Sequence, residues 1–271
     1  MTSSVSEARY SKPDVPRSDR QIRIGTMLVT MVEPHKGHEV AYNRWYECDH
    51  FYAGCMIGEH QFAGSRYVAT ADCKELRYPD DSPVTPDRSI GSYVAIYWVL
   101  DGKHDEWSKW AVDQVNWLHA NDRMFEERDH IHTLLYEYED EFAGKSDYVP
   151  PELALDHHFA GIAMVIGETA DGVELAQATE WFKQRPVPGE VVVVASPLPM
   201  PADRPGDVPA TSGTGRFLHL YFLEEDPREV WADRFALLGA EFQASGLGSI
   251  VFASPFLATV PGTDKYTDEL W

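Results

Sequence analysis

Cysteine is scarce in this chain, and its spacing excludes two kinds of covalent or metal cross-link. The 271 residues include only Cys48, Cys55 and Cys73, with no Cys-x-x-Cys pair. An odd number of cysteines without paired spacing predicts neither a disulfide framework nor a structural zinc site. Cys48 and Cys55 lie seven residues apart in one predicted helix, roughly 10 Å along its axis, which is too far for a disulfide. We expect all three to be reduced.

Basic residues are also few, and long apolar runs are missing. The sequence has 23 Lys and Arg against 44 Asp and Glu, a formal charge of −21. Nucleic acids and anionic membranes bind clustered Lys and Arg, so we expect neither as a partner. No run approaches the ~20 apolar residues of a membrane span, and residues 1–13 contain no hydrophobic signal region. We therefore expect a cytoplasmic protein, a monomer or homodimer, whose partner is a small hydrophobic substrate.

The common cofactor and nucleophile motifs are missing as well. The sequence contains no Gly-x-Gly-x-x-Gly, no Walker loop and no Gly-x-Ser-x-Gly. Nucleotide cofactors and a serine nucleophile are therefore unsupported, and we expect an enzyme that works without a cofactor.

What the sequence does contain is one order of elements written twice. Apolar alternation and runs rich in Val, Ile and aromatic residues predict eight strands, at residues 22–33, 60–70, 92–100, 128–139, 159–166, 190–196, 216–223 and 250–260. Helical patterns follow the first and third strand of each set. Each half thus has the order β-α-β-β-α-β, the split β-α-β arrangement of ferredoxin-like units.

This repetition predicts the domain organisation and the fold class. We assign residues 1–20 to a flexible arm, 21–142 to a first ferredoxin-like α+β unit, 143–156 to a linker and 157–271 to a second unit. A four-stranded sheet with both helices on one face leaves its other face bare. Packing the two bare faces together gives an intrachain pseudo-dimeric α+β barrel, and we expect ligand space between the sheets.

The helix within residues 35–57 carries an unusual polar stripe. Asn43, Glu47 and His50 recur at i, i+4 and i+7, and Tyr46 lies beside them. Amide, carboxylate, imidazole and phenol groups are those that proteins use to transfer protons and to hold an oxyanion. The alternative is an ordinary solvated face that happens to include a histidine.

The same stretch resembles a known family. Residues Tyr42 to His50, Tyr-Asn-Arg-Trp-Tyr-Glu-Cys-Asp-His, and the following Phe62 to Tyr67, Phe-Ala-Gly-Ser-Arg-Tyr, are similar to the Asn-x-Trp-Tyr…His and Phe…Arg-Tyr patterns of EthD-like members of the dimeric α+β-barrel superfamily. The resemblance implies the ferredoxin-like fold. The superfamily includes cofactor-free polyketide monooxygenases, cyclases, lactone isomerases and haem enzymes, so membership alone does not select a reaction. Those relatives usually have a proline after the histidine, whereas this chain has Phe51.

We combine these patterns into a catalytic hypothesis. His50 is the proton acceptor, because imidazole titrates near ~6.5, with Tyr46 or Asn43 stabilising the resulting oxyanion and Glu47 orienting the ring. The predicted enzyme is a lyase, dehydratase, cyclase or isomerase acting on an aromatic or polyketide-like carbonyl compound. The alternatives are a cofactor-free monooxygenase and a non-catalytic binding protein. No histidine occurs between His158 and His219, so we expect one active site and a second half that serves as scaffold.

Other aromatic and histidine side chains are candidates for binding the substrate, and they are Trp45, Tyr67, His130, His132, Tyr136, His219 and Tyr221. Alternation places His130, His132 and Tyr136 on one strand face, and a buried, hydrogen-bonded pair is the alternative reading. A His-x-His pair can begin a metal site, but the spacing supplies no third ligand, so we expect none. Residues 197–215, rich in Pro and Gly, are predicted to cover the mouth of the site.

Overall fold

Eight antiparallel strands form a closed barrel in the computed structural model, which describes residues 19–85, 87–204, 206, 208 and 215–271. The strands are β1 (Ile24–Pro34), β2 (Gln61–Val68), β3 (Tyr93–Leu100), β4 (Arg128–Phe142), β5 (Gly161–Thr169), β6 (Val191–Leu198), β7 (Arg216–Leu223) and β8 (Gly248–Ala258). All but the last two residues of the predicted 1–20 arm lie outside the described residues.

The strand order around the barrel follows from two similar units. The order is β1-β3-β2-β8-β5-β7-β6-β4, so that each set of four has the ferredoxin-like arrangement. The two sheets join at both seams, where β2 pairs with β8 and β4 pairs with β6. The predicted α+β pseudo-dimeric barrel is therefore confirmed.

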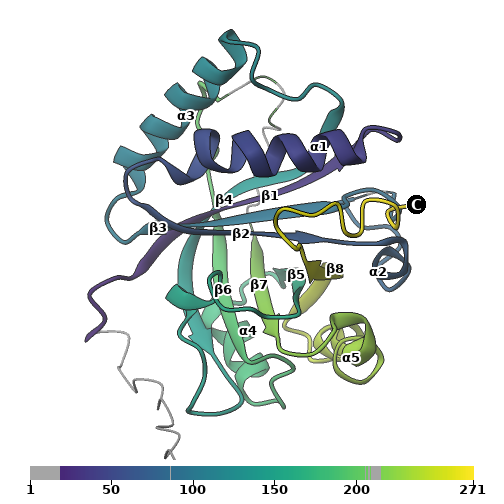
Figure 1. Cartoon of the computed structure of the whole chain (residues 1–271). Helices are drawn as coiled ribbons and strands as arrows, with labels where there is room; N and C mark the ends of the chain where they lie inside the picture. Colours follow the sequence, from purple (N-terminus) through teal and green to yellow (C-terminus); the bar gives the residue numbers. More distant parts are fainter. Residues whose placement is uncertain (1–18, 86, 205, 207, 209–214) are drawn as a thin grey trace, which may run out of the picture.

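The helices cover the outside of the barrel. In the first half these are α1 (Glu39–Trp45), its continuation η2 (Tyr46–Met56) and α3 (His104–Ala120), and in the second half α4 (Leu175–Lys183), α5 (Pro227–Arg234) and α6 (Leu238–Ala244). Figure 1 shows α1 and α3 on one side of the molecule and α4 and α5 on the opposite side. No helix in the described part of the chain is both long and apolar enough to cross a bilayer.

The barrel interior is a packed core. Large side chains from both sheets point inward and are fully buried, among them Trp98, Tyr136, Phe222, Phe252 and Phe256. The Trp98 and Phe222 rings meet edge to face, 6.5 Å apart, and the Trp98 indole donates a hydrogen bond to the carbonyl of Pro151 at 3.0 Å. Side chains therefore occupy the space between the sheets, where we had predicted room for a ligand.

One long connection from each half packs against the helices of the other half. The β2–β3 connection contains helix α2 (Ala71–Glu75) and packs against the second half. Its Tyr78 hydroxyl donates to the carbonyl of Phe235 at 2.9 Å, and its ring lies 6.1 Å from that of Trp231. In return, the β6–β7 connection reaches α3, where Asn116 donates to the carbonyl of Asp203 at 3.4 Å. Each half thus supplies a cover for the other.

The residues after β8 hold the first helix in place. The Asn43 amide donates to the carbonyl of Thr263 at 2.9 Å, and the Gly262 N–H donates to the Glu47 carboxylate at 2.8 Å. Leu270 is buried further along this segment. The segment that follows β8 therefore holds in place the helix that carries the predicted catalytic residues.

Candidate active site

A pocket opens between the first sheet and its covering helices. It is lined from below by β1, β3 and β4, from the sides by η2 and α3, and from above by the β6–β7 connection. Its cavity volume is about 120 Å³, and its mouth is open to solvent. Its apolar wall includes Leu28, Tyr97, Trp107, Val112, Leu135 and Met200. The pocket therefore lies between sheet and helices, on the outside of the barrel.

The helix widens where it meets this pocket. From Tyr46 to Met56 the turns are of the π type, with i→i+5 hydrogen bonds, which are rare and occur frequently at functional sites. The wider turn brings Tyr46, His50 and Gly54, each four residues apart, onto the pocket wall. No proline follows His50, and the helix continues through Phe51.

His50 lies against the aromatic wall with one nitrogen unsatisfied. Its ring stacks on Trp45 at 4.6 Å between centroids and meets Tyr46 edge to face at 5.2 Å. The Nδ1 atom is buried and has no hydrogen-bond partner among the residues that the structure describes. Burial, followed by the positive charge of Arg128 and by His130, lowers the pKa of His50 to about 3. The imidazole is therefore neutral at physiological pH and has an open position for a ligand.

Gly54 makes room for this imidazole. A Cβ atom at position 54 would lie 2.7 Å from both Cε1 and Nδ1 of the His50 ring, which is closer than real Cβ atoms approach. In Gly54→Ala we expect the ring to swing toward solvent and its pKa to rise from about 3 toward the ordinary value near 6.5. An NMR titration of the His50 Cε1 proton measures this shift. Cys48→Ala, an exposed change on the same helix, is the control, and an unmoved His50 titration in Gly54→Ala would contradict this packing.

Tyr46 shares a hydrogen bond across the pocket floor. Its hydroxyl lies 2.8 Å from that of Tyr97, and both phenols are buried. Burial raises the pKa of each phenol well above its ordinary value near 10. Both groups therefore stay protonated, and one hydroxyl proton of the pair can turn toward a ligand.

Arg128 and His130 enter the pocket from the start of β4. The Arg128 guanidinium lies 5.6 Å from the centre of the Trp45 ring and donates to the carbonyl of Phe125 at 2.7 Å. The His130 Nδ1 shares a hydrogen bond with the Thr133 hydroxyl at 2.8 Å. Arg128 brings a positive charge next to the neutral His50, and our sequence reasoning, which followed histidines along this strand, did not identify it.

Asn43 and Glu47 face away from His50, and the predicted polar stripe is wrong. Both contact Arg66 of β2, whose guanidinium donates to Asn43 Oδ1 at 3.0 Å and to Glu47 Oε1 at 3.3 Å. Arg66 also packs on the Tyr46 ring at 4.3 Å. The physical reason is the change from α-helix to π-helix at Tyr46, since the i, i+7 relation that joined Asn43 to His50 holds only for 3.6 residues per turn. Asn43 and Glu47 therefore position the helix, and neither carboxylate nor amide orients the imidazole.

His132 and Tyr136 lie on the opposite face of the sheet from His130. Their side chains share a 2.8 Å hydrogen bond and are buried. The prediction of one common face is wrong because the pairing register shifts between Met31 and Val32, which leaves Ile131 as an extra residue in β4. The pair is the buried, hydrogen-bonded alternative considered from the sequence.

The remaining predicted binding residues also lie outside the pocket. His219 and Tyr221 share a 3.2 Å hydrogen bond in the core of the second half, where Phe182, Phe217 and Phe242 pack on the His219 ring or its neighbours. These side chains fill the space that corresponds to the pocket of the first half. Tyr67 is buried at the β2–β8 seam, beside a separate surface groove. Trp45 lies behind His50.

Two buried histidines and the half-buried His50 make stability depend on pH. Burial lowers the pKa of His50 and His219 to about 3 and that of His132 to about 4, whereas each binds a proton near 6.5 in the unfolded chain. Below pH ~6.5 the unfolded state therefore binds more protons, and the free energy of unfolding falls as pH falls. Each group contributes up to about 1.4 kcal/mol per pH unit in that window.

His219→Gln tests this linkage, because glutamine keeps a polar group beside Tyr221 but does not titrate. We expect the slope of unfolding free energy against pH between 4.5 and 6 to flatten by about one proton, with a loss of about 1 kcal/mol at pH 8. Urea unfolding followed by circular dichroism over this range measures the slope. An unchanged slope would show that His219 already carries a proton in the folded protein.

The described residues do not bring together three or more His, Cys, Asp or Glu side chains that could hold a metal ion. Cys48 is exposed, Cys55 and Cys73 are buried, and all three are free thiols, as predicted. The pocket lining includes the imidazoles of His50, His119 and His130, the thiol of Cys55 and the phenols of Tyr46 and Tyr97.

Comparison with known proteins supports the fold and leaves the reaction open. No protein-family model and no curated protein matches the sequence. Among solved structures, an anthrone oxidase-like protein is 8% identical, aligns over 89% of this chain and 95% of its own, and has a TM-score of 0.51. Two further structures are of proteins provisionally named monooxygenases. The one from Lactobacillus acidophilus is 8% identical, aligns over 87% of this chain and 97% of its own, and has a TM-score of 0.41. The one from Fusobacterium nucleatum is 7% identical, aligns over 88% of this chain and 94% of its own, and has a TM-score of 0.47. The chain therefore shares the fold of the first of these proteins, the pseudo-dimeric α+β barrel.

Proposed function

We propose that the protein is an enzyme that removes a proton from a small, largely apolar substrate, next to a carbonyl or on a phenol, with His50 as the base. The observation that supports this most directly is the buried Nδ1 of His50, which no described residue reaches with a hydrogen bond, on the wall of an apolar pocket. In the tautomer that carries its hydrogen on Nε2, this nitrogen is free to accept a proton from a bound molecule.

The positive charge of Arg128 stabilises the product of the proton transfer. When the substrate loses its proton, negative charge develops on its oxygen, and the Arg128 guanidinium stabilises that oxyanion in a site of low dielectric. Arg128 also disfavours a proton on His50 in the empty pocket. The bound oxyanion offsets this repulsion, so that the imidazolium forms only beside the anion. Tyr46 can add a hydrogen bond to the same oxygen.

The fate of the anion decides the class of enzyme. Protonation at another atom gives an isomerase, loss of a leaving group gives a lyase or dehydratase, and attack on a second carbonyl gives a cyclase. A cofactor-free oxygenase is the second candidate, with a CH₂ group and O₂ yielding a carbonyl and water. The shared fold with an anthrone oxidase-like protein and the aromatic, water-poor wall around Tyr97 and Trp107 favour this alternative.

Hydrogen–deuterium exchange tests the step that all these reactions share. 2-Tetralone, a small apolar ketone with an acidic CH₂, is incubated with the protein in D₂O without oxygen, and the loss of its C1 proton signal is followed by NMR. We expect exchange faster than in buffer by at least tenfold. Exchange at the buffer rate, with the ketone shown to bind, would favour a non-catalytic binding protein. Repeating the assay with anthrone in air and measuring oxygen uptake distinguishes the oxygenase from the other classes.

A further inference from the structure

The charge lining the pocket is opposite to that of the protein as a whole. The chain has 44 acidic and 23 basic residues, yet the pocket wall contains no Asp or Glu among the described residues. It contains two guanidinium groups and three imidazoles, from His50, His119, Arg128, His130 and Arg204. Since the low-dielectric wall strengthens the field of these groups, the pocket favours an anion within a protein whose net charge repels one.

Arg204 differs from the other arginines near the site. Its Nε donates to the carbonyl of Val208 at 3.0 Å and its Nη1 to the carbonyl of Pro201 at 3.2 Å, so that the turn itself holds the side chain. Arg44 and Arg123, on neighbouring surfaces, are paired with Asp264 and Asp49. Arg204 has no carboxylate partner among the described residues and is half-buried.

Among the described residues, the half-buried Arg204 guanidinium has no counter-ion and is therefore an incomplete ion pair. Carboxylates bind guanidinium groups through two parallel hydrogen bonds, and such pairs gain strength when water is excluded. Arg204 belongs to the second half, whereas His50 and Arg128 belong to the first. The β6–β7 connection of the second half therefore places a cation, Arg204, on the pocket wall opposite the sheet.

We infer that the substrate is an aromatic or similarly flat carboxylate, with its carboxylate on Arg204 and its ring between the sheet and α3. The inference relies on the proposed function for the placement of the reactive end at His50. It assigns a binding residue to the half of the chain that we had predicted to be scaffold only. One site is then built from both units of the pseudo-dimer.

Binding of matched probes tests this inference without requiring turnover. 2-Naphthoate and 2-acetonaphthone have the same ring system and differ in charge, and isothermal titration calorimetry measures both. We expect the wild-type protein to bind 2-naphthoate at least tenfold more tightly, as one charge-assisted pair provides. Arg204→Gln should lower naphthoate affinity about tenfold and leave the ketone within a factor of two, while Arg204→Lys retains part of the preference.

The control is Arg23→Gln, an exposed arginine paired with Asp101 at a distance from the pocket, which should change neither affinity. Equal binding of the two probes to wild-type protein, or an equal effect of Arg204→Gln on both, would overturn the inference. Deuterium exchange uses the uncharged 2-tetralone, so its outcome is independent. Exchange without carboxylate preference leaves the proposed function standing, and preference without exchange leaves carboxylate binding standing.

Discussion

His50→Gln lowers the rate of proton exchange by about 10²–10⁴, the range that a positioned general base contributes. Glutamine has nearly the volume of histidine and keeps the stacking surface on Trp45, but its amide cannot accept a proton at neutral pH. Binding of 2-acetonaphthone should change little, because the loss concerns the chemical step. The measurement is the initial rate of deuterium incorporation into 2-tetralone, for the variant and the wild-type protein at equal ketone saturation.

His132→Gln is the matched control for this variant. It makes the same substitution at a buried histidine whose side chain lies on the other face of the sheet, bonded to Tyr136. We expect it to exchange at the wild-type rate. If both variants lost activity alike, the effect would come from the fold, and if His50→Gln exchanged normally, His50 would not be the base.

The pH profile separates a base in this environment from an ordinary histidine. Because burial and Arg128 lower the pKa of His50 to about 3, the imidazole is already deprotonated at pH 5, and kcat/KM should be independent of the state of His50 from there to pH 8. Arg128→Gln should raise the pKa of His50, although burial still holds it below the ordinary value, and move the acidic limb to higher pH. It should also slow exchange, since the oxyanion loses its cation.

Most of the fold could be predicted from the pattern of strands in the sequence. Residues 92–100, a continuous apolar run, form the buried strand β3, and the repeated order of strands and helices led to the correct barrel. These patterns predict the elements correctly because side-chain periodicity depends only on whether a residue faces the core. The position of the ligand space was not encoded in this way. It depends on volumes, and inward-pointing side chains such as Trp98 fill the barrel.

The candidate site was predicted in part, and two local irregularities explain what was missed. A π-helix beginning at Tyr46 rotates His50 away from Asn43 and Glu47, and one extra residue at Ile131 turns His132 to the other face from His130. Both errors arise because a local change of helix type or strand register changes the face on which every later side chain lies. Tyr46, His50 and His130 line the pocket. Arg128 was missed although it alternates with His130, because only the histidine and tyrosine side chains of that strand were considered, and Arg204 was missed because it lies in a connection without a periodic pattern.

Trp98→Ala should lower the free energy of unfolding by about 3–5 kcal/mol, the usual cost of removing a buried tryptophan. The indole is fully buried inside the barrel, contacts Phe222 of the other sheet and bonds to Pro151. For a chain of this size each kcal/mol corresponds to about 2–4 °C, so the melting temperature should fall by roughly 10 °C. Differential scanning calorimetry measures the change.

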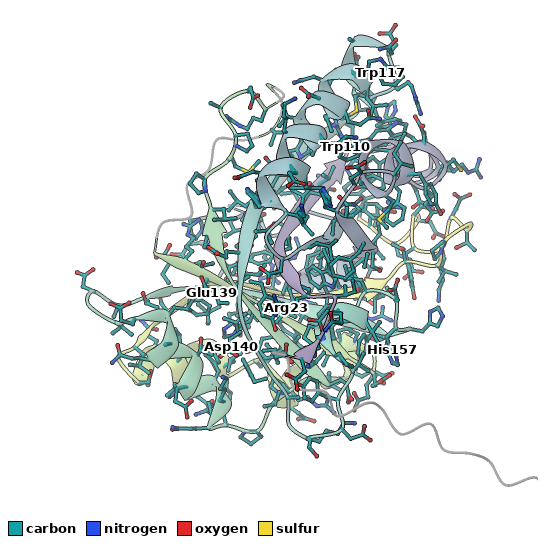
Figure 2. The ribbon with its side chains drawn as sticks, turned by 90° about the vertical axis from the view of Figure 1, so that its left-hand side faces the viewer. Arg23, Trp110, Trp117, Glu139, Asp140 and His157 are labelled. Atoms are coloured by element: carbon teal, nitrogen blue, oxygen red, sulfur yellow. The ribbon has the colours of Figure 1, made fainter. Side chains whose placement is uncertain are left out.

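Trp117→Ala is the control, because it removes the same side chain from an exposed position. Trp117 projects from α3 at the outer edge of the molecule, where its side chain is 49% exposed (Figure 2), and Trp117→Ala should cost under about 1 kcal/mol. If the space between the sheets were a ligand chamber, Trp98→Ala would enlarge an existing cavity, and its cost would approach that of Trp117→Ala. A large difference between the two variants would show that the space between the sheets is a packed core.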